Sequence, residues 1–471
     1  MPVFSFDRCP LLLIDGIGPF FRHYRKKRIN WSKIPFSHIE TEAGIKEAYL
    51  QSVPEDFQRF ITAVAAMGYN AVSLDDLAHL VPDPDYHPCL NARINAYREL
   101  YRQLFVIAEQ AGMSIFITTD VMSMNRALQK RFRGRRRGAY AYMAHCVDQL
   151  FRDFPQISGI ITRFGETDGL DVEGDFRSEL LLRHAGDARE FLRTVLPAFE
   201  KHRRLLIFRT WSLGVGRIGD LIWNRNTYSR VFSSIDSPSL VISMKYGETD
   251  FFRYLPVNKQ FFRSQHKTLV EFQARREYEG FGAYPSFFGW ECERYIQELV
   301  ADGNLKRSHL IGASVWCQTG GWGKRRQLTF IRNSSVWVEL NTYVIAHIVK
   351  GQSCQQAIDA FCEDYHQPAL AKEPFRDFLT RSERVIADLL YMRELAERKL
   401  FFRRLRMPPQ LFVFWDRVVI NHHLKRFLNI MISDTEACRQ QGWDALDDLH
   451  RMIELAEEHA LPMKGLRFQL E

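Results

Sequence analysis

The sequence predicts an α/β fold, a (β/α)8 TIM-type barrel followed by an α-helical C-terminal domain. From residue 10 to residue 325, short apolar runs rich in β-branched residues alternate with amphipathic helical stretches. That alternation is typical of parallel strands joined by crossover helices. Eight such units over about 315 residues match the size of a barrel with some enlarged loops. A doubly wound open sheet is the main alternative.

The eight predicted strands cover residues 11–15, 70–74, 114–119, 159–164, 205–210, 240–245, 268–272 and 310–316. Between them, apolar side chains recur every three to four residues, which indicates one buried face of a helix. The clearest examples lie within residues 94–108, 146–154 and 191–199.

Strand signals stop after Gly323, and the chain then continues as one helical stretch after another. We therefore predict a catalytic barrel over residues 1–335 and a helical domain over 336–471, with helices at 375–403 and 444–459. The segment 397–406 mixes cationic and aromatic residues and is interpreted as a solvated, basic helix face. It could instead pack on the barrel or on a second subunit, so a homodimer through the C-terminal helices is possible.

Composition and charge narrow the class of protein. The chain has 471 residues, 46% of them hydrophobic, and a formal net charge of +8, which favours anionic ligands without choosing among them. No signal peptide and no run of about 18 apolar residues is found. Eight scattered cysteines favour a reducing compartment. We expect a soluble, cytoplasmic protein without a membrane partner.

Polar side chains follow every predicted strand, where a parallel barrel carries its working residues. They are Asp15, Asp75, Asp76, Asp120, Glu166, Asp168, Arg209, Trp211, Lys245, Glu248, Asp250, Glu271, Arg275, Arg276, Glu277, Trp316, Gln318 and Trp322. Carboxylates, cations and Trp rings on one rim suit glycoside cleavage, which needs an acid, a second carboxylate and flat rings for sugar faces. Any one of these carboxylates could equally be an ordinary loop residue, and the Trp rings could be rim packing.

Other motifs weigh against competing functions. The basic runs 25–28 and 130–137 also follow predicted strands and could attract a polyanion, but solvated surface loops are the simpler interpretation. No nucleic-acid-binding signature accompanies them, so no nucleic acid is expected. Residues 214–219 match GxGxxG without a convincing helix after them. No metal site and no cofactor are predicted.

Two segments resemble the alpha-glucuronidases of glycoside hydrolase family 67. Residues 241–251, VISMKYGETDF, are similar to that family's Lys-Asn-Gly-Pro-Ile-Asp-Phe segment, with Lys245, Gly247, Asp250 and Phe251 in register. Residues 270–280, VEFQARREYEG, are similar to its Glu-Phe-Gln-x-x-x-Glu-Tyr-x-Gly motif, which is the more specific of the two.

The resemblance implies a barrel enzyme that removes glucuronic acid from an acidic oligosaccharide with inversion. It implies that Asp250 and Glu277 share the general-base role and that Glu166 is the general acid. Arg209 and Lys245 fall where that family binds the uronate carboxylate. The predicted substrate-binding residues are Arg209, Lys245, Arg163, Trp211, Glu271, Trp316 and Trp322.

The sequence also departs from that family. Glu248 and Thr249 replace its Pro-Ile pair, and Thr162 and Arg163 stand where a Lys is expected before the acid. Arg163 could supply the missing cation. The resemblance covers the barrel and the C-terminal helical region, and that family's large N-terminal domain has no counterpart here.

The sequence therefore predicts an inverting glycoside hydrolase acting on a uronic-acid sugar. A retaining glycosidase using Glu166 and Glu277 as acid and nucleophile is the first alternative. A non-catalytic barrel that binds acidic glycans or nucleic acid is the second.

Overall fold

The fold is described from a computed structural model. It describes residues 10–22, 24, 34–164, 174–212, 216–303, 305–306, 309–318, 328–331, 335–364, 371–391, 393–402, 404–406, 409–410, 426 and 429–462.

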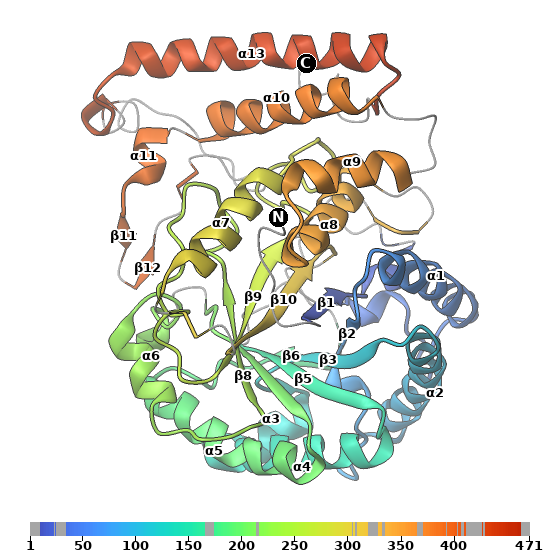
Figure 1. Cartoon of the computed structure of the whole chain (residues 1–471). Helices are drawn as coiled ribbons and strands as arrows, with labels where there is room; N and C mark the ends of the chain where they lie inside the picture. Colours follow the sequence, from blue (N-terminus) through green and yellow to red (C-terminus); the bar gives the residue numbers. More distant parts are fainter. Residues whose placement is uncertain are drawn as a thin grey trace.

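Eight parallel strands close into a barrel (Figure 1), in the order β1-β10-β9-β8-β7-β5-β3-β2. Their bounds are β1 Leu11–Asp15, β2 Ala71–Asp75, β3 Ser114–Asp120, β5 Ile157–Arg163, β7 Leu205–Arg209, β8 Leu240–Lys245, β9 Lys267–Gln273 and β10 Leu310–Trp316. Because β1 pairs with both β2 and β10, the sheet has no edge. The predicted barrel is confirmed, and the open-sheet alternative is wrong.

Helices surround the barrel, as Figure 1 shows. They are α1 Glu47–Ala66, α2 Pro88–Gln110, α3 Arg126–Phe132, α4 Arg136–Asp153, α5 Ala185–His202, α6 Arg225–Phe232, α7 Gly289–Ala301 and α8 Val336–Val349. The apolar faces predicted at 94–108, 146–154 and 191–199 lie on α2, α4 and α5. A small antiparallel pair, β4 Ser123–Met124 and β6 Arg177–Ser178, stands outside the barrel sheet.

Alternation along the strands explains why the barrel interior is apolar at one level and charged at the next. One layer of buried apolar side chains fills the interior: Leu13, Ala71, Phe116, Ile161, Ile207, Val241 and Leu269. Successive side chains of a strand point to opposite faces, so residues two or four positions further along point inward again. At the C-terminal ends these inward positions hold Asp15, Asp75, Asp120, Arg163, Arg209, Lys245 and Glu271.

The C-terminal region differs from its prediction at residues 375–403. Helix α10 spans Lys372–Leu390 and α11 spans Arg393–Glu397, and a two-stranded hairpin of β11 Phe401–Phe402 and β12 Leu405–Arg406 follows. The backbone turns extended at Tyr391, which forms a β-bridge with Gln410 and so leaves the helix. The predicted helix face at 397–406 is therefore wrong.

The remaining helices form two groups. Helix α8 packs on α7 and β10, as a helix after the last barrel strand does, and α9 Cys354–Asp364 packs on α8. Helices α10 and α13 Thr435–Glu458 pack side by side at one end of the molecule (Figure 1). The predicted helix at 444–459 corresponds to α13, which begins earlier. The division at residues 335 and 336, just before α8, stays a prediction.

Two further findings concern the described chain alone. None of its helices is long and apolar enough to cross a membrane. Its cysteines are free thiols at positions 89, 146, 292, 317, 354, 362 and 438.

Gly312 provides a test of barrel closure. It pairs with Leu11 of β1 where β10 shifts register against β9, and its φ is +153°. A Cβ there would lie 2.0 Å from the Leu11 carbonyl oxygen. We expect Gly312→Ala to lower the free energy of unfolding by about 2–4 kcal/mol in urea denaturation.

The matched control is Gly442→Ala in α13, where an added Cβ meets nothing within 4 Å. It should raise the free energy of unfolding by about 0.5–1 kcal/mol, because Ala is the better helix former. Equal stability of the two variants would contradict this account of the strand contact.

Candidate active site

Arg209 and Glu271 form a bidentate ion pair inside the C-terminal end of the barrel. Arg209 Nε and Nη2 lie 2.9 and 2.7 Å from the two Glu271 oxygens. The Ser243 hydroxyl and the Trp316 indole N–H also donate to Glu271, at 2.7 and 3.1 Å. Burial alone would raise the pKa of Glu271, but Arg209 and Lys245 outweigh it and hold that pKa below its ordinary value. Glu271 therefore stays ionised as the partner of Arg209.

Lys245 pairs with Asp250, which lies in the loop after β8. The Lys245 ammonium sits 4.0 Å from the centroid of the Trp211 ring and 4.4 Å from that of Phe251. The Tyr278 hydroxyl donates to the other Asp250 oxygen at 2.6 Å. One carboxylate is thus held between an ammonium and a phenol.

Glu277 is the second carboxyl of this group, in the turn after β9. It is 4% exposed, its backbone N–H donates to Gln273 Oε1 at 2.8 Å, and its Oε2 lies 3.4 Å from Arg275 Nη2. Burial raises the pKa of Glu277, and the charge of Asp250 raises it further. The Asp250 and Glu277 carboxyls are therefore close enough to interact electrostatically.

A second charged group lies on β2, β3 and β5. Arg163 donates to Asp75 at 3.2 Å and to Asp120 at 3.0 Å, and the Ser178 hydroxyl also donates to Asp120. Burial raises the pKa of Asp75 from 3.8 to about 7, because the nearby charges of Asp76 and Asp120 add to the effect and Arg163 only partly offsets it.

The structure brings most of the predicted site residues to the C-terminal end of the barrel. Arg163 belongs to the group on β2, β3 and β5. The first group consists of Arg209, Lys245, Asp250, Glu271, Glu277, Trp211 and Trp316. The predicted acid Glu166 and the predicted rim residue Trp322 lie outside the described residues. The predicted cations Arg163, Arg209 and Lys245 are each paired with a carboxylate. The Arg209 guanidinium carbon also lies 4.6 Å from the centroid of the Trp316 ring, much as the Lys245 ammonium lies 4.0 Å from that of Trp211.

Sequence reasoning missed two members of the site. Gln273 lies two residues beyond Glu271 on β9, so strand alternation could have placed it inward. Tyr278 follows Glu277 in a turn, where no periodic pattern predicts the direction of a side chain. Its pKa is raised well above the ordinary value by burial and by Asp250 and Glu277, so it keeps its proton and can donate.

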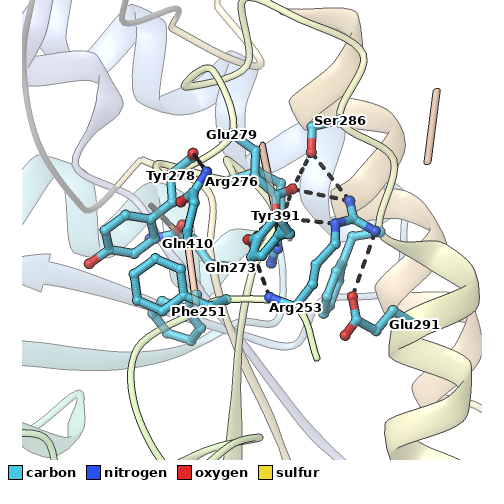
Figure 2. Close-up of polar contacts among 12 residues, drawn as sticks. Phe251, Arg253, Gln273, Arg276, Tyr278, Glu279, Ser286, Glu291, Tyr391 and Gln410 are labelled. Carbon is cyan, nitrogen blue, oxygen red and sulfur yellow. Dashed lines mark hydrogen bonds and ion pairs between the residues drawn. The ribbon is translucent and has the colours of Figure 1, made fainter. Parts of the chain in front are cut away.

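Arg276, another residue after β9, belongs to a structural network (Figure 2). Glu279 accepts from Arg276 at 2.6 and 3.0 Å, from Arg253 at 3.1 Å and from the Tyr391 hydroxyl at 2.7 Å. Arg253 also contacts Glu383 of α10 at 3.1 Å. Burial opposes ionisation of Glu279, but the two arginines hold its pKa well below its ordinary value. The network ties the loops after β8 and β9 to the C-terminal helices.

The hairpin β11–β12 is tied to the same rim. Arg406 lies 3.1 Å from Glu248, and the Thr249 hydroxyl donates to the Arg406 carbonyl at 3.3 Å. Arg404 pairs with Asp220 in the loop after β7. Glu248 and Thr249, which stand in place of the Pro-Ile pair of the alpha-glucuronidase segment, therefore both contact this hairpin, and Asp220 contacts it as well.

The basic run 130–137 covers the end of α3, the turn after it and the start of α4, and its charged side chains are exposed. Its ion pairs include Arg131 with Asp83, Arg136 with Asp187 and Arg137 with Glu190. The run 25–28 lies outside the described residues. No group of three or more His, Cys, Asp or Glu side chains in the part of the chain that the structure describes could hold a metal ion.

Fold and site together define a (β/α)8 barrel protein with paired charges and two interacting carboxyls at its C-terminal end. The chain matches no protein-family model and no curated protein sequence. Among solved structures, CpGH84B is 11% identical with a TM-score of 0.45, over 88% of this chain and 62% of that one. This chain therefore spans less than two thirds of CpGH84B.

Two other similar structures are enzymes by name. An O-GlcNAc hydrolase from Thermobaculum terrenum is 11% identical with a TM-score of 0.42, over 85% of this chain and 73% of that one. A GH5-4 broad-specificity endoglucanase from Ruminococcus champanellensis is 12% identical with a TM-score of 0.37, over 68% of this chain and all of that one. These similarities concern the fold alone.

Asp75 provides a test of the electrostatics. Since folding raises its pKa, the protonated form stabilises the fold at pH below 3.8, and that contribution is lost as the pH rises through about 7. Asn cannot titrate, so the melting temperature of Asp75→Asn relative to wild type should rise from pH 4 to about 7 and then level off. Thermal denaturation followed by circular dichroism measures this.

The control is Asp236→Asn at an exposed position. The melting temperature of this variant should differ from that of the wild type by a nearly constant amount between pH 4 and about 7. A constant difference for Asp75→Asn as well would contradict the raised pKa.

Proposed function

We propose that the protein is a glycoside hydrolase that cleaves the glycosidic bond of a uronic-acid sugar with inversion. The observation that carries the proposal is the pair of buried, interacting carboxyls, Asp250 and Glu277, beside the cations Lys245 and Arg209. An inverting enzyme needs a base that activates water on one side of the sugar and an acid on the other, roughly 6.5–9.5 Å apart. Asp250 and Glu277 supply the base side, and Glu166 is the proposed acid.

The cations support an acidic sugar as the substrate. Lys245 and Arg209 lie on the faces of Trp211 and Trp316, which limits their movement without neutralising their charge. A uronate carboxylate can share such a cation with its protein partner, since an ammonium has three donors and a guanidinium five. A neutral sugar offers these cations only hydroxyl groups, which are weaker acceptors than a carboxylate.

Arg163 is proposed as a further contact to the substrate. Asp75 and Asp120 hold its guanidinium on the side of the barrel formed by β2, β3 and β5. Glu271 is proposed to orient the Arg209 guanidinium toward the substrate, since it accepts two hydrogen bonds from that group.

Two alternatives stay open. In a retaining glycosidase, Glu166 and Glu277 would be acid and nucleophile at a separation of about 5–5.5 Å. In a binding protein, acidic glycans or nucleic acid would bind without turnover and with an affinity that falls as salt rises. A homodimer through the C-terminal helices and a cytoplasmic location stay predictions from the sequence.

The test is incubation of the purified protein with aldouronic oligosaccharides and a panel of uronic and neutral glycosides, followed by NMR of the released sugar. We expect a uronic acid of inverted anomeric form, with release reduced at least about 1000-fold in Glu166→Gln for natural leaving groups. A retained anomer would favour the first alternative. Release of neutral sugars alone would contradict the role of Lys245 and Arg209, and silence across the panel would favour the binding protein.

A further inference from the structure

A cavity of about 350 Å³ lies beside helix α6, away from the candidate active site. Figure 1 shows α6 on the outside of the barrel. The other wall of the cavity is the segment 260–266, which leads into β9. Its last residue, His266, has Nε2 2.8 Å from the carbonyl oxygen of Ile235, which lies between α6 and β8. The cavity is therefore near the N-terminal ends of β8 and β9, whereas the candidate active site is at the C-terminal ends of the strands.

Two arginines of the lining have no acidic partner. Arg225 and Arg263 are exposed, and neither pairs with a carboxylate in the part of the chain that the structure describes. The segments that carry them, 225–234 and 254–270, contain two and three cationic residues and no Asp or Glu. The lining thus carries two positive charges that no ion pair balances, and an anion would be attracted to it.

Two buried polar atoms of the lining also lack a hydrogen-bond partner among the described residues. Gln260 is fully buried, and its amide nitrogen donates to the Trp223 carbonyl at 2.8 Å, but its Oε1 is unpaired. His266 Nε2 faces a carbonyl and so carries the proton of the neutral ring, which leaves the unpaired Nδ1 as an acceptor. An unsatisfied buried acceptor costs free energy, and a ligand with hydroxyl donors would recover it.

Aromatic rings and hydroxyls complete the lining. Tyr228 and Phe232 lie one turn apart on α6 with ring centroids 4.7 Å apart, and Ser229 and Ser233 line the cavity beside them. Apolar rings next to hydrogen-bonding groups suit a sugar, which has apolar faces and a polar edge. Ligand pockets range from roughly 300 to 1,000 Å³, so this cavity has room for a ligand of one or two rings.

We propose that this cavity is a second ligand site that binds a small anionic sugar, meaning a hydroxylated ring that carries a carboxylate or a phosphate. Arg225 and Arg263 bind the anionic group, since a guanidinium fork matches both carboxylate and phosphate oxygens. Gln260 and His266 accept hydrogen bonds from ring hydroxyls. The inference stands without the proposed function, because it rests on the cavity alone and is tested by binding.

The first experiment is isothermal titration calorimetry of the full chain at low salt with glucuronate, glucose 6-phosphate, glucose and inorganic phosphate. We expect at least one of the two anionic sugars to bind more tightly than glucose and more tightly than inorganic phosphate. Glucose binding as tightly as both would contradict the role of the arginines. Inorganic phosphate binding as tightly as both would contradict the role of the rings and acceptors, and binding of neither anionic sugar would overturn the site.

Arg263→Gln locates the bound sugar. It should weaken binding at least about tenfold, because hydrogen bonds to a charged group are lost. The matched control is Arg230→Gln, which removes another exposed arginine of α6 that is not part of the lining. Its affinity should stay within about twofold of the wild type. Equal weakening in the two variants would assign the effect to general surface charge and overturn the site.

Ser229→Trp tests the cavity in a second way. Ser229 is an exposed position of α6 that lines the cavity, so a large side chain there blocks the space and leaves the packed face of the helix unchanged. We expect Ser229→Trp to lose binding of the anionic sugar while its circular dichroism spectrum stays that of the wild type. A sugar that binds Ser229→Trp as tightly as the wild type binds elsewhere, at the barrel end for example, and that result would overturn the proposal.

Discussion

The pairing of charges inside the barrel is the constraint on which the candidate site depends. Strand alternation points Arg163, Arg209 and Lys245 inward at the end of a closed sheet, where each is at most 5% exposed. A buried ion without a partner costs several kcal/mol, so each cation requires a carboxylate within reach. The barrel supplies Asp75 and Asp120 to the first, Glu271 to the second and Asp250 to the third.

This constraint also orders the site. Ion pairs whose partners come from different strands fix each other's rotamers, so donors and acceptors are in place before any ligand arrives. Electrostatic catalysis depends on such preorganised groups, because they need not reorient when charge develops. Asp250 shows the effect most clearly, since Lys245 and Tyr278 hold it from opposite oxygens.

The C-terminal region takes part in the same rim. Arg404 and Arg406 of the hairpin bind carboxylates in the loops after β7 and β8, while Tyr391 and Gln410 reach Glu279 and Tyr278. These four contacts hold the C-terminal residues against the loops that carry the candidate site. The Glu248 and Thr249 side chains both contact Arg406, so the loop after β8 is held directly against the hairpin.

The sequence predicts all eight barrel strands because parallel strands buried on both faces are nearly continuous apolar runs. It also predicts which residues follow them, and therefore the charged rim. It cannot predict that Arg209 pairs with Glu271, 62 residues away, because that choice depends on strand order and side-chain reach. Helix α10 was predicted too long because apolar spacing continues past Tyr391, whose partners are Gln410 and Glu279.

Burial and neighbouring charge act in the same direction on two carboxyls at this end of the barrel. Burial raises the pKa of both Asp75 and Glu277, and a nearby carboxylate raises it further in each case, Asp76 for Asp75 and Asp250 for Glu277. The cations Arg163 and Arg275 oppose the effect at these two residues without cancelling it. The charge at this end of the barrel therefore becomes more negative as the pH rises through these two pKa values, so the same burial that orders the ion pairs also makes the charge of the site depend on pH.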